Sequence, residues 1–296
     1  MISVFGSANM DLVAYTATAP KRGETVTGRA FATIPGGKGA NQAIAAARAG
    51  AEVAFIGAVG DDAFGPVMRE TLASAGVDVT RLRVAPGSSG IAHIVVDDAG
   101  GNSIIVVPGA NGTVTGPTDG DLEVIDRSDA LLLQLELPME AVVAAATRAR
   151  VPVVLTPAPA GELPPELLAA VGLIIPNEHE AAAITGLSDP EESLKALLDL
   201  VPEAVVTLGS EGSLYGSRSG ARLRVPAVPV TAVDTTAAGD TFAGALAVAR
   251  AEGMPVERAL RFAAAAAALS VQRKGATTSM PARPEIDAAL RTTVTP

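Results

Sequence analysis

One acidic residue in the last third of the chain stands where it could take a proton from a hydroxyl group. Asp240 follows Ala238 and Gly239 at the predicted start of an Ala-rich helix. The small residues leave their backbone N–H groups open to a ligand, and the positive end of the helix dipole points toward whatever binds there. A lone Ala-Gly-Asp sequence is also typical of an ordinary helix N-terminus with an acidic cap. The segment therefore predicts an anion site beside a base only if other segments support it.

A glycine-rich segment near the N-terminus is the second candidate for ligand binding. Residues 36–42 hold three glycines, which allow close backbone approach, and Lys38 and Asn41, which offer donors. The segment is not a P-loop, because Lys38 is followed by Gly39 and not by Ser or Thr. It favours a ligand rich in hydroxyl groups. The alternative is a flexible loop that caps the following helix.

Polar side chains follow three of the predicted strands. They are Asn9, Asp11, Glu136, Asn177 and Glu180. The carboxyl ends of parallel strands meet at one edge of a sheet, where ligands of open α/β folds bind. Each of these residues alone is a common turn or cap residue, but together with Asp240 they predict one site at this edge.

The elements that must position these residues alternate between strands and helices. Short runs that are apolar on both faces predict strands of a parallel sheet covered on both sides. These runs are 2–5, 53–59, 130–135, 153–156, 173–175 and 204–208. Ala-rich stretches predict the helices 40–49, 64–75, 139–148, 241–250 and 258–269. The expected fold class is therefore α/β, a doubly wound and mostly parallel sheet with helices on both faces.

Two segments interrupt this alternation. Residues 25–34 and 90–107 are strand-like, and turn signals at 97–102 predict that the second run is a hairpin. Strands without helices between them do not easily join a parallel sheet, so we expect a small β-sheet that lies over its edge as a lid and is formed mainly by residues 12–34 and 90–108. No linker is long enough to divide the chain, and residues 1–296 are expected to form a single domain.

Composition excludes several other classes of protein. The formal net charge is −10 and no cluster of Lys or Arg is visible, which argues against nucleic acid as a partner. The absence of Cys excludes disulfides and thiolate metal sites, and His93 and His179 leave little for a His-based one. The N-terminus lacks the pattern of a signal peptide, and no stretch of about 18 uncharged apolar residues occurs. We expect a cytoplasmic protein without a membrane partner.

Four segments occur in an order and rough spacing that are shared with one enzyme family. They are Gly36 to Gln42, Asn177-x-x-Glu180, Thr207-Leu208-Gly209-Ser210-x-Gly212 and Asp234-Thr235-x-Ala237-Ala238-Gly239-Asp240. In these segments the chain resembles the PfkB carbohydrate kinases, and the similarity extends from Ser3 to Leu290. The resemblance implies an ATP-dependent kinase that phosphorylates an alcohol group of a sugar.

The resemblance also assigns roles on the sugar side. It implies that D-ribose is phosphorylated at its 5-hydroxyl, with Asp240 as general base and the N–H groups of Ala238 and Gly239 stabilising the transferred phosphoryl group. The residues implied to hold the sugar are Asn9, Asp11, Gly37, Lys38, Asn41, Glu136 and Asp240. Deoxyribose, another pentose or a nucleoside is an alternative acceptor. A sugar-binding protein without turnover is a further alternative, which the presence of a base disfavours.

On the nucleotide side the resemblance implies ATP, Mg²⁺ and a monovalent cation, usually K⁺. The residues implied for ATP are Asn177, Thr207, Leu208, Gly209, Ser210, Glu211, Gly212, Gly239 and Ala264. Glu180 would order Mg²⁺ through water. The implied K⁺ site comprises Asp234, Thr236, Ser270, Arg273, Gly275 and Ser279, mostly through carbonyl oxygens.

The chain departs from this family at two positions on the nucleotide side. Ala264 stands where many relatives have His or Asn, and Glu211 places a negative charge in the nucleotide loop, so we expect its side chain to face solvent. A further expectation concerns assembly. The lid strand 91–96 would expose its edge in a monomer, so we expect a homodimer in which two lids pair.

Overall fold

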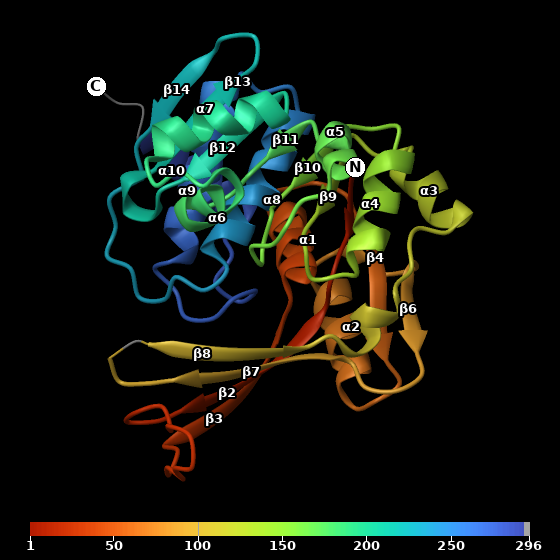
Figure 1. Cartoon of the computed structure of the whole chain (residues 1–296), viewed down its shortest axis with the longest axis vertical. Coiled ribbons are helices and arrows are strands. Elements are labelled where there is room, and N and C mark those ends of the chain that lie inside the picture. The colour runs from red at the N-terminus through yellow and green to blue at the C-terminus, as the bar shows by residue number, and fades with distance from the viewer. Residues whose placement is uncertain (100, 293–296) are drawn as a thin grey trace.

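The computed structural model describes residues 1–99 and 101–292, and within them ten strands form one central sheet (Figure 1). The order is β14-β13-β12-β11-β10-β9-β1-β4-β5, and β6 also pairs with β4. The strands are β1 (Ile2–Phe5), β4 (Val53–Gly60), β5 (Val77–Asp78), β6 (Leu82–Ala85), β9 (Ala130–Leu133), β10 (Val153–Leu155), β11 (Leu173–Ile174), β12 (Glu203–Thr207), β13 (Ser213–Ser217) and β14 (Arg222–Val225). All neighbours are parallel except β12 with β13 and β13 with β14.

Helices cover both faces of this sheet and form two separate hydrophobic cores. One core holds side chains of α1 (Lys38–Arg48), α2 (Phe64–Ser74), α8 (Ala238–Ala251), α9 (Val256–Ser270) and α10 (Arg283–Thr292). The other holds side chains of α3 (Asp119–Ile125), α4 (Met139–Arg148), α5 (Pro165–Ala170), α6 (Glu178–Thr185) and α7 (Pro190–Leu200). Within β9, Leu132 enters the first core and Leu131 and Leu133 the second. The predicted α/β fold with helices on both faces is confirmed.

A second, four-stranded sheet projects from the body of the molecule, at the bottom of Figure 1. Its order is β3-β2-β7-β8, from β2 (Asn9–Tyr15), β3 (Ala30–Gly36), β7 (Gly90–Val96) and β8 (Asn102–Val107). We call this sheet the lid. The hairpin predicted at 90–108 is present as β7 and β8.

The lid differs from the sequence prediction at its first segment. The lid was predicted to begin at about residue 12, but strand β2 begins at Asn9, so Asn9 and Asp11 lie in the lid, while residues 16–29 contain no strand. The reason is pairing: β2 is hydrogen-bonded to β3 on one side and to β7 on the other along its whole length. Asn9 and Asp11 are thus fixed by a sheet that only distant segments complete.

Small residues let α1 and α8 pack closely beside the central sheet. A Cβ at Gly244 of α8 would lie 2.8 Å from the backbone oxygen of Gln42 and 2.8 Å from the Cβ of Ala45. Glycine at this position therefore permits the contact that brings the first turns of the two helices together. Among the helices that the structure describes, none combines the length and the apolar character needed to cross a membrane.

Candidate functional site

Asp240 lies in the first turn of α8 and is held by two side chains of α1. Ala237 precedes the helix in a left-handed conformation, with φ 58° and ψ 18°. The Asp240 carboxylate is 8% exposed, and its Oδ2 accepts a hydrogen bond from Asn41 Nδ2 at 3.0 Å while its Oδ1 accepts one from Gln42 Nε2 at 3.1 Å. Burial raises the pKa of Asp240, and Lys38 together with these two amides opposes that rise.

The backbone at this helix end offers fewer free donors than the sequence suggests. The Ala238 N–H donates to the Thr235 carbonyl oxygen at 3.2 Å and is therefore engaged. The described residues provide no acceptor for the N–H groups of Gly239 and Asp240. A helix N-terminus with unpaired N–H groups binds anions well. The predicted anion site thus depends on Gly239 and Asp240.

The glycine-rich segment turns sharply into α1 and brings Lys38 to the cluster. Gly37 has φ 93°, and a Cβ there would lie 2.7 Å from the backbone nitrogen of Asn9. The backbone N–H of Lys38 donates to Glu136 Oε2 at 2.9 Å. Burial lowers the pKa of Lys38, but the surrounding carboxylates, with Asp240 the strongest, outweigh burial and raise it. Lys38 therefore carries its charge among acidic groups.

Glu136 connects β1, the lid and α1. Its Oε2 accepts from the Ser7 hydroxyl at 2.5 Å and from Asn9 Nδ2 at 3.4 Å, in addition to the Lys38 N–H. Asn9 Oδ1 in turn accepts from Asn111 Nδ2 at 2.7 Å. Asn111 is 1% exposed and also bonds the N–H and carbonyl of Ala8. The amide of Asn9 is therefore fixed from two sides.

Asp11 faces the same cluster from the lid strand β2. Burial and the charge of Glu136 raise its pKa to about 7, with a smaller rise from Asp240 and an opposing effect of Lys38. A Cβ at Gly36 would lie 2.6 Å from Asp11 Oδ2, so glycine there leaves room for the carboxylate. The structure thus brings together all of the sugar-side residues that the sequence predicted, Asn9, Asp11, Gly37, Lys38, Asn41, Glu136 and Asp240.

Sequence reasoning missed several polar residues of this cluster. They are Ser7, Gln42, Asn111, Gln134 and Thr156. Gln42 could have been found, because it lies inside the predicted glycine-rich segment. Asn111 and Gln134 carried no signal in the sequence, since their partners lie 103 and 92 residues away along the chain.

A cavity of about 330 Å³ lies on the other side of the α8 N-terminus. Seven predicted nucleotide-side or phosphate-side residues line it, namely Thr207, Gly209, Ser210, Gly212, Ala238, Gly239 and Ala264. Leu208 does not line it and is buried in the second core. Glu211 does not line it either: its side chain is 71% exposed and pairs with Arg224 at 3.0 Å, facing solvent as expected.

Asn177 and Glu180 form a reciprocal cap at the start of α6. Asn177 Oδ1 accepts from the Glu180 N–H, and Glu180 Oε2 accepts from the Asn177 N–H, each at 2.8 Å. Burial raises the pKa of Glu180. Within residues 1–99 and 101–292, no group of three or more His, Cys, Asp or Glu could hold a metal ion. Glu180 therefore fits Mg²⁺ only in the way that Mg²⁺ often binds, through one carboxylate, water and substrate phosphates.

The predicted K⁺ residues lie around the loop that follows α9. Asp234 joins the two segments of this region, because its Oδ1 accepts from the Thr236 N–H at 2.9 Å and its Oδ2 from the Gly275 N–H at 2.8 Å. These hydrogen bonds outweigh burial and lower the pKa of Asp234. The Arg273 guanidinium instead forms an ion pair with Glu285. The remaining hydroxyls donate to nearby carbonyls, Ser270 to Ala267 and Ser279 to Ala276.

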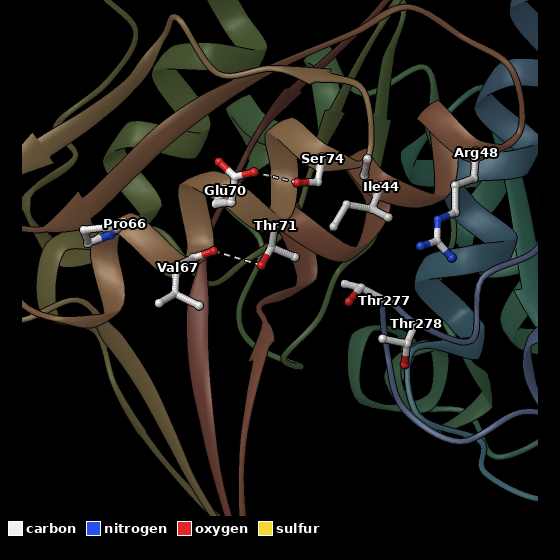
Figure 2. A pocket seen from close by; sticks show the side chains of 10 residues that line it. Ile44, Arg48, Pro66, Val67, Glu70, Thr71, Ser74, Thr277 and Thr278 are labelled. Atoms are coloured by element: carbon white, nitrogen blue, oxygen red, sulfur yellow. Dashed lines mark hydrogen bonds between the residues drawn. The ribbon is translucent and has the colours of Figure 1, made fainter.

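A larger cavity, of about 580 Å³, is bordered by Thr277 and Thr278, which lie between the predicted K⁺ residues Gly275 and Ser279 (Figure 2). It is formed by α1, α2 and the segment before α10, with Ile44, Val67, Thr71 and Thr277 among its lining residues. None of the predicted site residues lines it. Cavity volume alone therefore does not locate the chemistry.

Comparison with known proteins places the chain in a family. The model of the pfkB family carbohydrate kinases matches residues 1–283. The ribokinase of Bacillus subtilis is 44% identical over 98% of this chain and 99% of its own length, and that of Schizosaccharomyces pombe is 42% identical over 97% and 96%. The structure of Arabidopsis thaliana ribokinase complexed with ribose and ATP superimposes with a TM-score of 0.91 at 37% identity, covering 98% of both chains. The chain belongs to the pfkB family of carbohydrate kinases.

Proposed function

We propose that this chain transfers the γ-phosphoryl group of ATP to the 5-hydroxyl of D-ribose, giving ribose 5-phosphate and ADP. One observation carries the proposal: two consecutive residues at the α8 N-terminus face two different sites. Gly239 lines the 330 Å³ cavity, whereas Asp240 lies in the polar cluster with Asn41 and Lys38. A phosphoryl group that passes from the cavity to the cluster meets both residues. The names of the relatives, and the solved complex of one of them with ribose and ATP, support the same assignment.

In the proposed reaction, Asp240 accepts the proton of the 5-hydroxyl as its oxygen attacks the γ-phosphorus. The carboxylate must be ionised for this step, and Lys38, Asn41 and Gln42 all favour the ionised form against burial. The N–H groups of Gly239 and Asp240 stabilise the negative charge of the transferred group. Proton removal and charge stabilisation thus come from one turn of one helix.

The remaining cluster residues hold the sugar hydroxyls. Asn41 Oδ1 is buried and has no hydrogen-bond donor among the described residues. A buried acceptor without a donor is unfavourable, and a sugar O–H would supply one. Asn9, Asp11, Gly37, Lys38 and Glu136 supply the further donors and acceptors, and a site built this way rejects analogues that lack a hydroxyl.

ATP occupies the 330 Å³ cavity in this proposal, with its adenine near Ala264 and its phosphates toward Gly239. One border of the cavity is formed by Thr207, Gly209, Ser210 and Gly212. Asn177 lies next to this border, since it pairs with Thr207 in a parallel bridge. Glu180 would hold Mg²⁺ through water, and the ion would supply positive charge to neutralise the phosphates.

The lid also joins two copies of the chain in this proposal, because Phe31, Ile104 and Ile105 are 64%, 52% and 68% exposed on it. Light scattering of the protein and of Ile105→Asp tests this dimer, which the variant should weaken.

The experiment that tests the function is coupled ADP release with D-ribose, deoxyribose, fructose and adenosine as acceptors. D-ribose should give the highest kcat/KM. Deoxyribose is the comparison of most interest, because the deoxyribokinase of Salmonella typhi is 38% identical over 95% of this chain. The variant Asp240→Asn should lower kcat by about 10² to 10⁴. ADP release as fast as that of the parent would contradict the role of Asp240, and no release with any sugar would indicate a binding protein.

The proposed K⁺ site gives a second, independent test. A cation held near Asp234 and Gly275 would fix the loop that leads to α8. We expect kcat to rise when K⁺ replaces Na⁺ or Li⁺ at constant ionic strength. Equal rates in the three salts would remove the site, and Asp234→Ala should abolish the difference between them.

A further inference from the structure

Two buried glutamines lie behind Asp240, where no substrate atom is proposed to reach. Gln42 and Gln134 are 0% and 1% exposed. Gln134 Nε2 donates to Gln42 Oε1 at 2.6 Å, and Gln42 Nε2 donates both to Asp240 Oδ1 at 3.1 Å and to Thr156 Oγ1 at 3.2 Å. The two amides thus form a continuous line of hydrogen bonds that ends on the carboxylate.

The direction of this line of hydrogen bonds is fixed by the Asp240 carboxylate. An amide has one carbonyl oxygen and one NH₂ group, so Gln42 can be placed in two ways that differ by a flip. The Asp240 carboxylate only accepts hydrogen bonds, so the Gln42 NH₂ group must face Asp240 and the Gln42 oxygen must face the NH₂ group of Gln134. Gln134 Oε1 is buried and has no hydrogen-bond partner among the described residues. The flipped Gln42 amide would set its oxygen against the Asp240 carboxylate and its NH₂ group against that of Gln134. Both contacts would be repulsive.

Glycines make the space that this arrangement needs. A Cβ at Gly6 would overlap Gln134 Oε1 and would lie 2.8 Å from the Cα of Gly39. At Gly244, α8 packs close to the backbone oxygen of Gln42 in α1, next to the two glutamines. Backbone approach from Gly6, α1 and α8 therefore encloses the two glutamines.

We infer that Gln42 and Gln134 are positioning residues for the proposed phosphoryl transfer: Gln134 holds the oxygen of the Gln42 amide in place, and Gln42 fixes the carboxylate of Asp240. With Asn41 on one oxygen and Gln42 on the other, the carboxylate cannot rotate about its Cβ–Cγ bond without losing a hydrogen bond. A base fixed in this way stays oriented toward the attacking hydroxyl. The inference rests on the proposed function, because it acts through the general base.

Other charged groups also face Asp240, from four different elements. They are Lys38 of α1, Asp11 of β2, Glu136 after β9 and Glu180 of α6. Lys38 favours the ionised carboxylate, and the acidic groups disfavour it. The N–H of Gln42 acts in the same sense as Lys38, so removing it raises the pKa of Asp240 and moves the acidic limb of the kcat/KM profile to higher pH.

The test is a pair of near-isosteric apolar variants, Gln42→Met and Gln134→Met, assayed with D-ribose and ATP. Loss of a hydrogen bond to a charged group predicts a fall in kcat of about 10- to 100-fold for Gln42→Met, with both KM values within about twofold. The acidic limb should move upward. Met68→Val, in the core between α2 and the sheet, serves as the control for lost stability and should leave kcat and the pH profile unchanged.

The double variant Gln42→Met/Gln134→Met separates positioning from general packing. If Gln134 acts through Gln42, the kcat of the double variant equals that of Gln42→Met, whereas independent effects would multiply. Multiplying effects, or a Gln42→Met protein with the parent kcat and pH profile, would overturn the inference. If Gln42→Met does not fold, Gln134→Met alone must still lower kcat and move the acidic limb. A parent protein without kinase activity would refute the proposed function instead.

Discussion

The two sides of the α8 N-terminus are built from different groups. On the sugar side, four ionisable side chains act on one another electrostatically, those of Asp11, Lys38, Glu136 and Asp240, and the pKa values of Asp11, Lys38 and Asp240 are raised. On the nucleotide side, no residue that lines the 330 Å³ cavity within the described chain is charged. If the proposed function holds, recognition of the sugar depends on the identity of side chains. Recognition of the nucleotide then depends on the backbone and on the shape left by small residues.

The largest effect should follow a change on the sugar side that leaves the nucleotide side intact. Asp11→Ala removes a charged hydrogen-bonding group, so kcat/KM for D-ribose should fall by about 10- to 100-fold. The KM for ATP should stay within about twofold, because Asp11 is in the lid and does not line the cavity. Steady-state kinetics with each substrate varied in turn measures both. Equal losses for the two substrates would break the proposed division.

A change of shape on the nucleotide side should have a smaller effect, on the binding of ATP and not on that of D-ribose. Ala264→Leu places three more carbon atoms in the cavity, and overpacking of this size predicts a rise of about tenfold in the KM for ATP. The KM for D-ribose should not change. Isothermal titration with a non-hydrolysable ATP analogue gives the same comparison without turnover. A change in the affinity for D-ribose alone would place Ala264 on the sugar side and contradict the proposed division.

The two sides should also differ in how pH affects stability. The pKa of Asp11 is raised to about 7 in the folded state from 3.8, so the folded chain binds more protons than the unfolded chain between these values. The contribution of Asp11 to stability therefore falls as pH rises from about 4 through 7. The melting temperature of Asp11→Asn should exceed that of the parent at pH 8 by more than it does at pH 5. A constant difference would mean that Asp11 is not buried in its charged form.

The smallest effect is expected for Glu211, the charge in the nucleotide loop. Its side chain pairs with Arg224 in solvent, where an exposed ion pair contributes about 0 to 1 kcal/mol. Glu211→Gln should leave the KM for ATP within about twofold and the melting temperature nearly unchanged. Arg224→Gln is the matched partner variant. A large rise in ATP affinity for Glu211→Gln would show that the charge does act on the nucleotide.

Much of the fold could be predicted from the sequence because the signals are local. The strand 2–5 and the helix 139–148 match the structure at both ends, since their apolar runs and boundaries lie within the segments themselves. Residues 130–135 were predicted as one strand, but β9 ends at Leu133. Gln134 follows it and turns toward Gln42, a partner that is 92 residues away.

In the candidate site, too, the residues in local motifs could be predicted from the sequence, and their distant partners could not. Asp240 and residues 36–42 carry their chemistry in short motifs, and the structure brings them together. The hydrogen bonds that orient these residues come from Ser7, Asn111 and Gln134, isolated polar residues without a motif. Such partners are set by tertiary packing, which a single sequence does not reveal.

The position of Asn9 and Asp11 in a lid strand has a consequence for how the protein can vary. The first residues of β2 pair with both β3 and β7, so Asn9 and Asp11, two of the residues proposed to hold the sugar, are part of the small sheet, while Asp240 lies in α8 beside the large sheet. Any substitution that alters the twist of β7 or β8 will displace a carboxylate that it never touches. Substrate preference in this chain can therefore drift through mutations on the outer strands, far from the reacting atoms.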